Sequence, residues 1–144
     1  MIREAKEGDL LPLLQLYLHL HEQRMPEQDT HVMAVWQSIL QDKNHHLIVC
    51  EEDGKIVSSC VCVVILNLTR NVRPYALIEN VVTHPDYRKH GLVSACLNYA
   101  KQIAQRENCY KIMLLTGAKD EATLHIYRKA GYNSNDKTAF IQWL

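Results

Sequence analysis

The stretch that decides the fold reads Ile78-Glu79-Asn80-Val81-Val82-Thr83-His84-Pro85-Asp86-Tyr87-Arg88-Lys89-His90-Gly91-Leu92-Val93-Ser94. β-Branched and aromatic residues over 75–83 predict a strand. Pro85 lacks an amide hydrogen and disfavours helical angles at the preceding residue, so it ends that strand. From Leu92 the apolar residues recur at helical spacing, which predicts a helix to about Glu107. The chain therefore passes here from a strand through a short loop into a helix.

The connecting loop has the composition of an anion-binding site. Arg88 and Lys89 supply positive charge, and Gly91 precedes a first helical turn whose amides have no partner within the helix. Two interpretations are open: a site for phosphates, or an ordinary connection in which the glycine relieves a tight turn. The loop is not a P-loop, because no Gly-Lys-Ser/Thr follows at the required spacing.

Two motifs carry a resemblance to a known family. Arg88-x-x-Gly91-x-Val93 is similar to the Arg/Gln-x-x-Gly-x-Gly/Ala signature of the GNAT N-acetyltransferases, with Val93 where glycine or alanine is usual. Downstream, Tyr127-Arg-Lys-Ala-Gly131-Tyr132 resembles the Tyr-x-Lys-x-Gly-Phe segment of the same family. Two ordered motifs are more specific than either alone, and the resemblance spans about residues 55–132.

The resemblance implies where an acetyl-CoA molecule would be held. In GNAT enzymes the loop amides grip its pyrophosphate, and the preceding strand pairs its main chain with the pantetheine arm. Here the strand residues would be Val81, Val82 and Thr83, with an N–H near Val82 as oxyanion donor. The residues around the pyrophosphate would be Arg88, Lys89, His90, Gly91, Leu92, Val93 and Ser94. Asp120 falls where many relatives have an asparagine that touches the cofactor, and no metal is implied.

Two side chains are candidates for proton transfer. Strict alternation along the strand puts Glu79 on the same face as Val81 and Thr83, two residues before the cofactor-pairing segment, where it would serve as general base. The alternative is a salt-bridged or edge-exposed glutamate. Tyr127 falls where the family has a tyrosine directed at the cofactor sulfur, and its phenol would serve as general acid. The alternative is core packing, because Leu124, Tyr127 and Ala130 share helical spacing.

Composition limits the classes of function. With 144 residues the chain predicts a single domain, 1–144, which the resemblance makes an N-acetyltransferase domain. Sixteen basic residues balance sixteen acidic ones, so no global field draws in nucleic acid or an anionic membrane. Five cysteines, an odd number without a secretory signal, favour reduced thiols and a cytoplasmic location. Cys60 and Cys62 have no second ligand pair, so no metal site is expected.

The order of predicted elements gives a fold class. Strands are predicted at 1–5, 47–51, 56–68, 75–83, 111–116 and 140–144, and helices at 9–21, 31–41, 92–107 and 121–129. Asp9 and Asp120 are expected to cap helices. The unit over 75–116 implies a right-handed crossover between parallel strands. We therefore expect a mixed α/β fold with a mostly antiparallel sheet and helices on both faces, as in the GNAT fold, where the parallel pair splays apart.

The expected activity is direct acetyl transfer from acetyl-CoA to a primary amine in a ternary complex. Cys109-Tyr110-Lys111-Ile112 and the Tyr127 segment resemble, faintly, the glucosamine-6-phosphate N-acetyltransferases, which carry an aspartate at the position of Leu115. The acceptor is thus open between a small amine such as an amino sugar and a protein amine. The alternative is a non-catalytic domain of the same fold that senses acyl-CoA. Arg70 and Arg73 lie in a polar loop that either meets an anionic acceptor or is solvated. A homodimer is left open.

Overall fold

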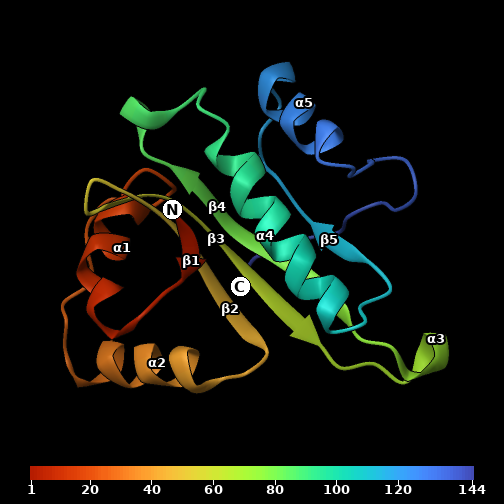
Figure 1. Ribbon diagram of the computed structural model, residues 1–144, viewed down its shortest axis with the longest axis horizontal. Coiled ribbons are helices and arrows are strands. Elements are labelled where there is room, and N and C mark those ends of the chain that lie inside the picture. The colour runs from red at the N-terminus through yellow and green to blue at the C-terminus, as the bar shows by residue number, and fades with distance from the viewer.

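A single sheet of five strands forms the centre of the structure, a computed structural model that describes all of residues 1–144. The strands lie side by side in sequence order (Figure 1). Their bounds are β1 Ile2–Glu4, β2 His45–Glu52, β3 Lys55–Ile65, β4 Tyr75–Thr83 and β5 Ile112–Leu114. The first four pair antiparallel, whereas β5 runs parallel to β4. The mostly antiparallel sheet with one parallel pair is confirmed.

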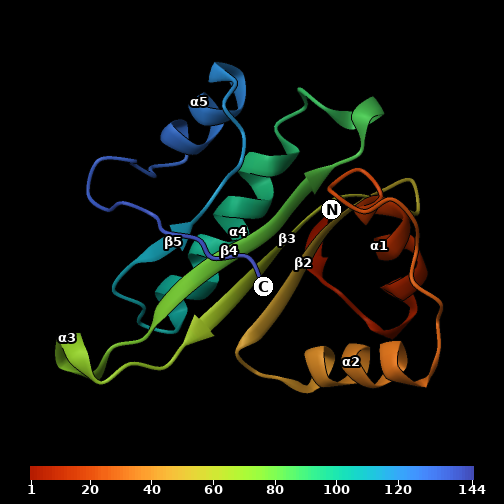
Figure 2. The same cartoon turned by 180° about the vertical axis from the view of Figure 1, so that it is seen from behind.

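Helices cover both faces of this sheet (Figures 1 and 2). Their bounds are α1 Leu10–Tyr17, α2 Thr30–Gln41, α3 Thr69–Val72, α4 Leu92–Arg106 and α5 Glu121–Lys129, with short 3-10 turns η1 Glu7–Asp9 and η2 Pro85–Tyr87. Adjacent residues of β3 enter opposite buried clusters: Val61 packs with α1 and α2, and Cys62 packs with α4. This period-two pattern buries both faces. None of the helices is long and apolar enough to cross a membrane.

Local sequence explains how several elements begin and end. Asp29 caps α2 by accepting a hydrogen bond of 2.9 Å from the Val32 amide. Asp53 and Gly54 both have positive φ, 49° and 75°, which suits the tight hairpin between β2 and β3. Asp120 caps α5, as expected from the sequence. The bounds predicted for β4 and α5 agree with the structure at both ends.

Three expectations from the sequence are wrong. The first helix ends at Tyr17 rather than near His21, with turns over the next residues. The Asp9 side chain does not cap α1, because its carboxylate binds Arg3 and accepts from the Lys6 amide, the second bond closing the N-terminus of η1 instead. Residues 140–144 form no strand and are exposed to solvent. Strand propensity is present there, but a strand also needs an edge to pair with, and this segment pairs with none.

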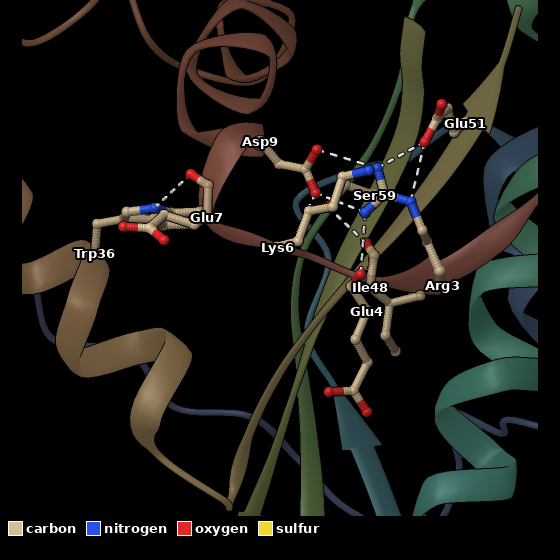
Figure 3. A network of polar contacts seen from close by, with 9 residues as sticks. All are labelled: Arg3, Glu4, Lys6, Glu7, Asp9, Trp36, Ile48, Glu51 and Ser59. Atoms are coloured by element: carbon tan, nitrogen blue, oxygen red, sulfur yellow. Dashed lines mark hydrogen bonds and ion pairs between the residues drawn. The ribbon is translucent and has the colours of Figure 1, made fainter. Parts of the chain in front are cut away.

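A charge network ties the first strand to its surroundings (Figure 3). The Arg3 guanidinium binds both oxygens of Asp9, at 2.6 and 3.0 Å, and also Glu51 at 2.6 Å. Burial alone raises the pKa of Asp9, but hydrogen bonds from Arg3 and from the Lys6 amide outweigh it and hold this pKa below its ordinary value. The network therefore joins β1, η1 and β2 while Asp9 is ionised.

Replacing Asp9 with asparagine is expected to lower the free energy of unfolding by about 1–3 kcal/mol, because Arg3 and the Lys6 amide lose a buried charged acceptor. A depressed pKa in the folded state stabilises the protein above the unfolded value of about 3.9, and this contribution is lost as pH falls below it. Urea unfolding at neutral and acidic pH measures both effects. Glu22→Gln, at an exposed carboxylate without partners, is the matched control; an equal loss in both variants would contradict the assignment.

Candidate active site

The β4 and β5 strands part after three residue pairs. Ala76, Leu77 and Ile78 pair with Ile112, Met113 and Leu114. Beyond Ile78, β4 continues to Thr83 paired with β3 alone, while the chain after Leu114 leads away to α5 (Figure 1). One backbone edge of β4 is therefore unpaired from Glu79 onward. An extended molecule with amide groups can pair along such an edge as an added strand.

A β-bulge at Asn80 changes which side chains face which way. Val61 pairs with Glu79 and Ser59 pairs with Val82, so three steps along β4 match two along β3. Asn80 takes up the extra residue with φ of 52°, a conformation that asparagine tolerates. Val81 then packs against the α4 cluster, and Val82 packs against α1 and α2. The expected strict alternation beyond Glu79 is wrong for this reason.

Glu79 is the first residue of β4 beyond the last pair with β5. Its side chain is exposed and forms no ion pair or hydrogen bond within the chain. It is paired across β3 with Val61, which places it on the sheet face that α1 and α2 cover. The salt-bridged alternative is thus not observed. A free carboxylate stands at the point where the two parallel strands separate.

The end of β4 is fixed to its neighbours by buried hydroxyl groups. The Thr83 hydroxyl lies 2.8 Å from that of Ser58, which in turn donates to the carbonyl oxygen of Val82 at 3.0 Å. The Cys96 thiol of α4 donates to the same Ser58 oxygen at 3.9 Å. Val82 and Thr83 are themselves buried. This chain of contacts holds the main chain of β4 in place relative to α4.

The loop between β4 and α4 presents unpaired donors and positive charge. Gly91 precedes the helix with φ of 76°, and no side chain caps the first turn, so the amides of Leu92, Val93 and Ser94 have no intrahelical partner. Arg88 and Lys89 are exposed and form no ion pair within the chain. Helix N-termini of this kind attract anions. The anion site in this loop stays a prediction.

Val93 departs from the glycine or alanine of the motif, and its side chain is accounted for by packing. Together with Leu92 it is half-buried against the cluster between the sheet and α4. Its added bulk thus fills core space.

Tyr127 lies on α5, half-buried against the same cluster. Burial raises the pKa of Tyr127, and a hydrogen bond with Thr116 acts in the opposite direction without cancelling the effect. Thr116 follows β5 closely, so the phenol stands at the end of the strand that parts from β4. An ordinary tyrosine is already protonated at neutral pH, and the raised pKa moves its ionisation further into the alkaline range.

Asp120 has a structural role that the structure shows directly. Its carboxylate accepts hydrogen bonds from the Thr123 amide at 2.9 Å and from the Thr123 hydroxyl at 2.7 Å. These bonds lower the pKa of Asp120. A contact between Asp120 and a cofactor stays a prediction.

Two loop arginines do not reach toward the site. Arg73 donates to the carbonyl oxygens of Asn108 and Cys109, both at 3.1 Å. The Arg70 guanidinium lies 5.5 Å from the centre of the Tyr110 ring. Both residues hold the loop between β3 and β4 against the loop between α4 and β5. Arg70 is exposed, as the solvated-loop interpretation expects, whereas Arg73 is half-buried. A contact with an anionic acceptor stays a prediction.

Sequence reasoning missed three residues near the site. Asn80 forms the bulge, and Thr116 acts on the pKa of Tyr127. Ser59, the partner of Val82, acts on the pKa of Tyr17 of α1. Burial raises the pKa of Tyr17 to about 12 despite a hydrogen bond with Ser59. An asparagine inside a β-branched run is a weak sign of a bulge. The other two become visible only when distant elements are brought together.

Comparison with known proteins finds similar sequences and similar folds. A family model described as "Acetyltransferase (GNAT) family" matches residues 13–132. A glucosamine 6-phosphate N-acetyltransferase of Trypanosoma brucei brucei is 28% identical over 137 residues, which cover 94% of this chain and 90% of that protein.

Solved structures share the whole fold. A candidate acetyltransferase from Agrobacterium tumefaciens str. C58 has a TM-score of 0.89 and 38% identity, with 99% of each chain covered. The glucosamine-6-phosphate N-acetyltransferase of Arabidopsis thaliana has a TM-score of 0.87 at 21% identity, covering 99% of this chain and 97% of that chain, and shows the fold alone.

Proposed function

Because the chain belongs to the GNAT acetyltransferase family, we propose that it moves an acetyl group from acetyl-CoA to a primary amine, with Glu79 as general base and Tyr127 as general acid. The observation that carries this proposal is the separation of β4 from β5 directly before Glu79. The unpaired edge of β4 suits the pantetheine arm. The α4 N-terminus, with Arg88 and Lys89, suits the pyrophosphate.

The proposed reaction needs no covalent enzyme intermediate. Glu79 takes a proton from the acceptor, directly or through water, while the amine nitrogen attacks the thioester carbonyl. A main-chain N–H near Val82 stabilises the oxyanion. The carbon–sulfur bond then breaks, and Tyr127 gives its proton to the departing thiolate. The cysteines do not serve as acyl carriers in this scheme, since four are buried and Cys109 is half-buried.

The acceptor is proposed as a small primary amine, with amino sugars first in order. Support comes from the relative in Trypanosoma brucei brucei, which acts on glucosamine 6-phosphate and matches nearly the whole chain. Leu115, 44% exposed after β5, stands where the glucosamine-6-phosphate enzymes carry an aspartate. That substitution removes a charged contact near the acceptor end, so the sugar phosphate itself is not assigned.

Release of free thiol from acetyl-CoA tests the activity. The panel contains glucosamine, glucosamine 6-phosphate, aminoglycosides, and peptides with a free N-terminus or lysine. We expect amine-dependent thiol release with at least one small amine, and acetylated product of the matching mass. Saturable acetyl-CoA binding without thiol release for any acceptor would instead support the acyl-CoA sensor.

Removing the loop charges is expected to weaken cofactor binding. The double variant Arg88→Gln, Lys89→Gln should raise KM for acetyl-CoA about tenfold, equivalent to about 1.4 kcal/mol, with kcat nearly kept. Both side chains are exposed, so the difference from wild type should shrink at high salt. Initial rates over a range of acetyl-CoA and salt concentrations measure this. Lys101→Gln, at an exposed lysine further along α4, is the control; an equal effect there would remove the loop from its role.

A further inference from the structure

Two cations lie against one tyrosine ring where β4 and β5 begin. The Arg70 guanidinium is 5.5 Å from the centre of the Tyr110 ring, and the Lys111 ammonium is 5.2 Å from the same centre. The Lys111 ammonium also lies 5.0 Å from the centre of the Tyr75 ring, which meets the Tyr110 ring edge to face. We call these four residues the Tyr110 cluster. Its members come from α3, from β4 and from the residues just before β5.

The positive charge of the Tyr110 cluster has no counter-ion within the chain. Neither Arg70 nor Lys111 takes part in any of the ion pairs of the structure. By contrast, the neighbouring Arg73 is satisfied by two main-chain carbonyl oxygens. Lys111 is half-buried, and withdrawing an unpaired charge from water is unfavourable. The cluster therefore presents two cations that an anion would neutralise.

The loop that carries Arg70 is held in a strained conformation. Three consecutive residues have positive φ angles of 54°, 58° and 59°: Arg70, Asn71 and Val72. Such angles are uncommon outside glycine and are outliers for a β-branched residue such as valine. The Asn67 amide fixes this turn by donating to the Arg73 carbonyl oxygen at 3.1 Å. Strain of this kind gathers at ligand-binding and catalytic sites. Here it accompanies the placement of Arg70 beside Tyr110.

Main-chain hydrogen bonds hold the other side of the cluster in place. The Tyr110 amide donates to the Pro74 carbonyl oxygen at 2.9 Å, and the Ala76 amide donates to the Lys111 carbonyl oxygen at 3.0 Å. These bonds fix the segment before β5 against the start of β4. The two tyrosine rings and the lysine are thus positioned by the sheet itself.

The cluster lies on the same face of the sheet as Glu79. Ala76 and Ile78 pack against α4. By alternation, the side chains of Tyr75, Leu77 and Glu79 point to the opposite face. The bulge in β4 begins only after Glu79, so alternation holds over this part of the strand. Four strand steps separate Tyr75 from Glu79, which is about 13 Å between their Cα atoms.

Apolar side chains line this face between Glu79 and the cluster. Leu77 pairs with Met113 of β5, and both side chains are half-buried. Residues 140–144 pass across this side of β4 and β5 in Figure 2 with their side chains exposed, so Leu77 and Met113 keep part of their surface accessible. A molecule on this face would meet a carboxylate at one end, apolar groups in the middle and two cations at the other end.

We propose that the Tyr110 cluster binds an anionic group of the acceptor, a phosphate or a carboxylate, while the amine of the same molecule lies at Glu79. This inference rests on the proposed acetyl transfer and names the class of its acceptor, a small amine with a negative charge at the far end. The side chains of Lys111 and Glu79 both reach into the interval between them. A phosphorylated amino sugar, or a tripeptide that spans about 10 Å, can therefore approach both.

Acceptor pairs that differ only in the anionic group test the inference. One pair is glucosamine 6-phosphate and glucosamine, and the other is a tripeptide with a free carboxylate and its amide. We expect wild-type kcat/KM to favour the charged member of at least one pair by about tenfold, as for a hydrogen bond to a charged group. This preference should shrink at high salt. The pair that shows it identifies the anion as phosphate or carboxylate, and no preference in either pair overturns the inference.

Two variants test whether the preference comes from the cluster. Lys111→Met keeps an unbranched stem against both rings without the charge, and Arg70→Gln changes an exposed side chain. Each should raise KM for the charged acceptor by about three- to tenfold, whereas rates with the uncharged member stay within about twofold of wild type. Lys43→Gln, at an exposed lysine before β2, should keep the wild-type preference. A preference that survives in both cluster variants overturns the inference.

A titration without turnover separates this inference from the proposed activity. Glucose 6-phosphate and an N-acetylated tripeptide carry the anions but no acceptor amine. In nuclear magnetic resonance spectra, at least one of them should shift the amide signals of Tyr110 and Lys111 in the wild type and not in Lys111→Met. If these shifts occur while no amine is acetylated, the proposed activity fails and the anion site stands. Absence of these shifts with both probes overturns the inference. So do shifts that persist in Lys111→Met and vanish in Arg88→Gln, Lys89→Gln, because the anion then binds at the α4 N-terminus.

Discussion

Replacing Glu79 with glutamine is expected to lower kcat for acetyl transfer by two to four orders of magnitude, roughly the contribution of a general base. Glutamine keeps the size of the side chain but takes up no proton. Because Glu79 is exposed and has no partner within the chain, the substitution breaks no internal contact and should leave the unfolding midpoint unchanged. Steady-state rates with the best amine of the panel, beside a thermal unfolding curve, measure both quantities.

A second readout separates proton transfer from simple loss of charge. At alkaline pH the solvent removes the proton from the acceptor, so the defect of the Glu79→Gln variant should shrink as pH rises. Glu52→Gln, at the end of β2, removes a carboxylate that makes no hydrogen bond and should keep wild-type rates. A defect of constant size at every pH would place Glu79 in acceptor binding rather than in catalysis.

Replacing Tyr127 with phenylalanine is expected to lower kcat about a hundredfold while KM for acetyl-CoA stays nearly constant. The ring still packs against the α4 cluster, so only the hydroxyl and its contact with Thr116 are lost. Since burial raises the pKa of Tyr127, the acid form is present throughout the neutral range and is lost only above about pH 10. The alkaline decline that comes from this ionisation should be missing in the variant.

Tyr99→Phe provides the matched control for Tyr127. Tyr99 lies on α4 and is half-buried against the same cluster, away from the parting of the strands. Loss of its hydroxyl should leave kcat within a factor of about two of wild type. If both variants lose turnover equally, packing of the cluster explains the effect and the acid role falls. Unchanged turnover in Tyr127→Phe would have the same consequence.

The elements around the site were predictable because their signals are local. The turn at Asp53 and Gly54, the cap at Asp120 and the stop at Pro85 each depend on a few neighbouring residues. From these, the bounds of β4 and α5 follow. The motif residues of the β4–α4 loop were likewise visible as a continuous stretch.

What could not be predicted depends on pairing between distant parts of the chain. The bulge at Asn80 exists because β3 advances two residues while β4 advances three, and the asparagine is only a weak local sign of that mismatch. The segment from Phe140 has the composition of a strand, yet it pairs with no edge of the sheet. Asp9 was expected to cap the first helix, but its carboxylate binds Arg3 instead. That contact joins separate elements, so local sequence does not predict it.

The short pairing between β4 and β5 makes the position of the proposed active site adjustable. Only three rungs join these strands, and Glu79 stands immediately past the third. If β5 were one residue longer, a fourth residue pair would form. The strands would then separate beyond the Glu79 carboxylate, which would lie beside paired strands. If the last residue pair were lost, the strands would separate at Ile78 and the opening around Glu79 would widen. In the proposed mechanism, the register of one short strand thus sets the width of the opening in which donor and acceptor meet.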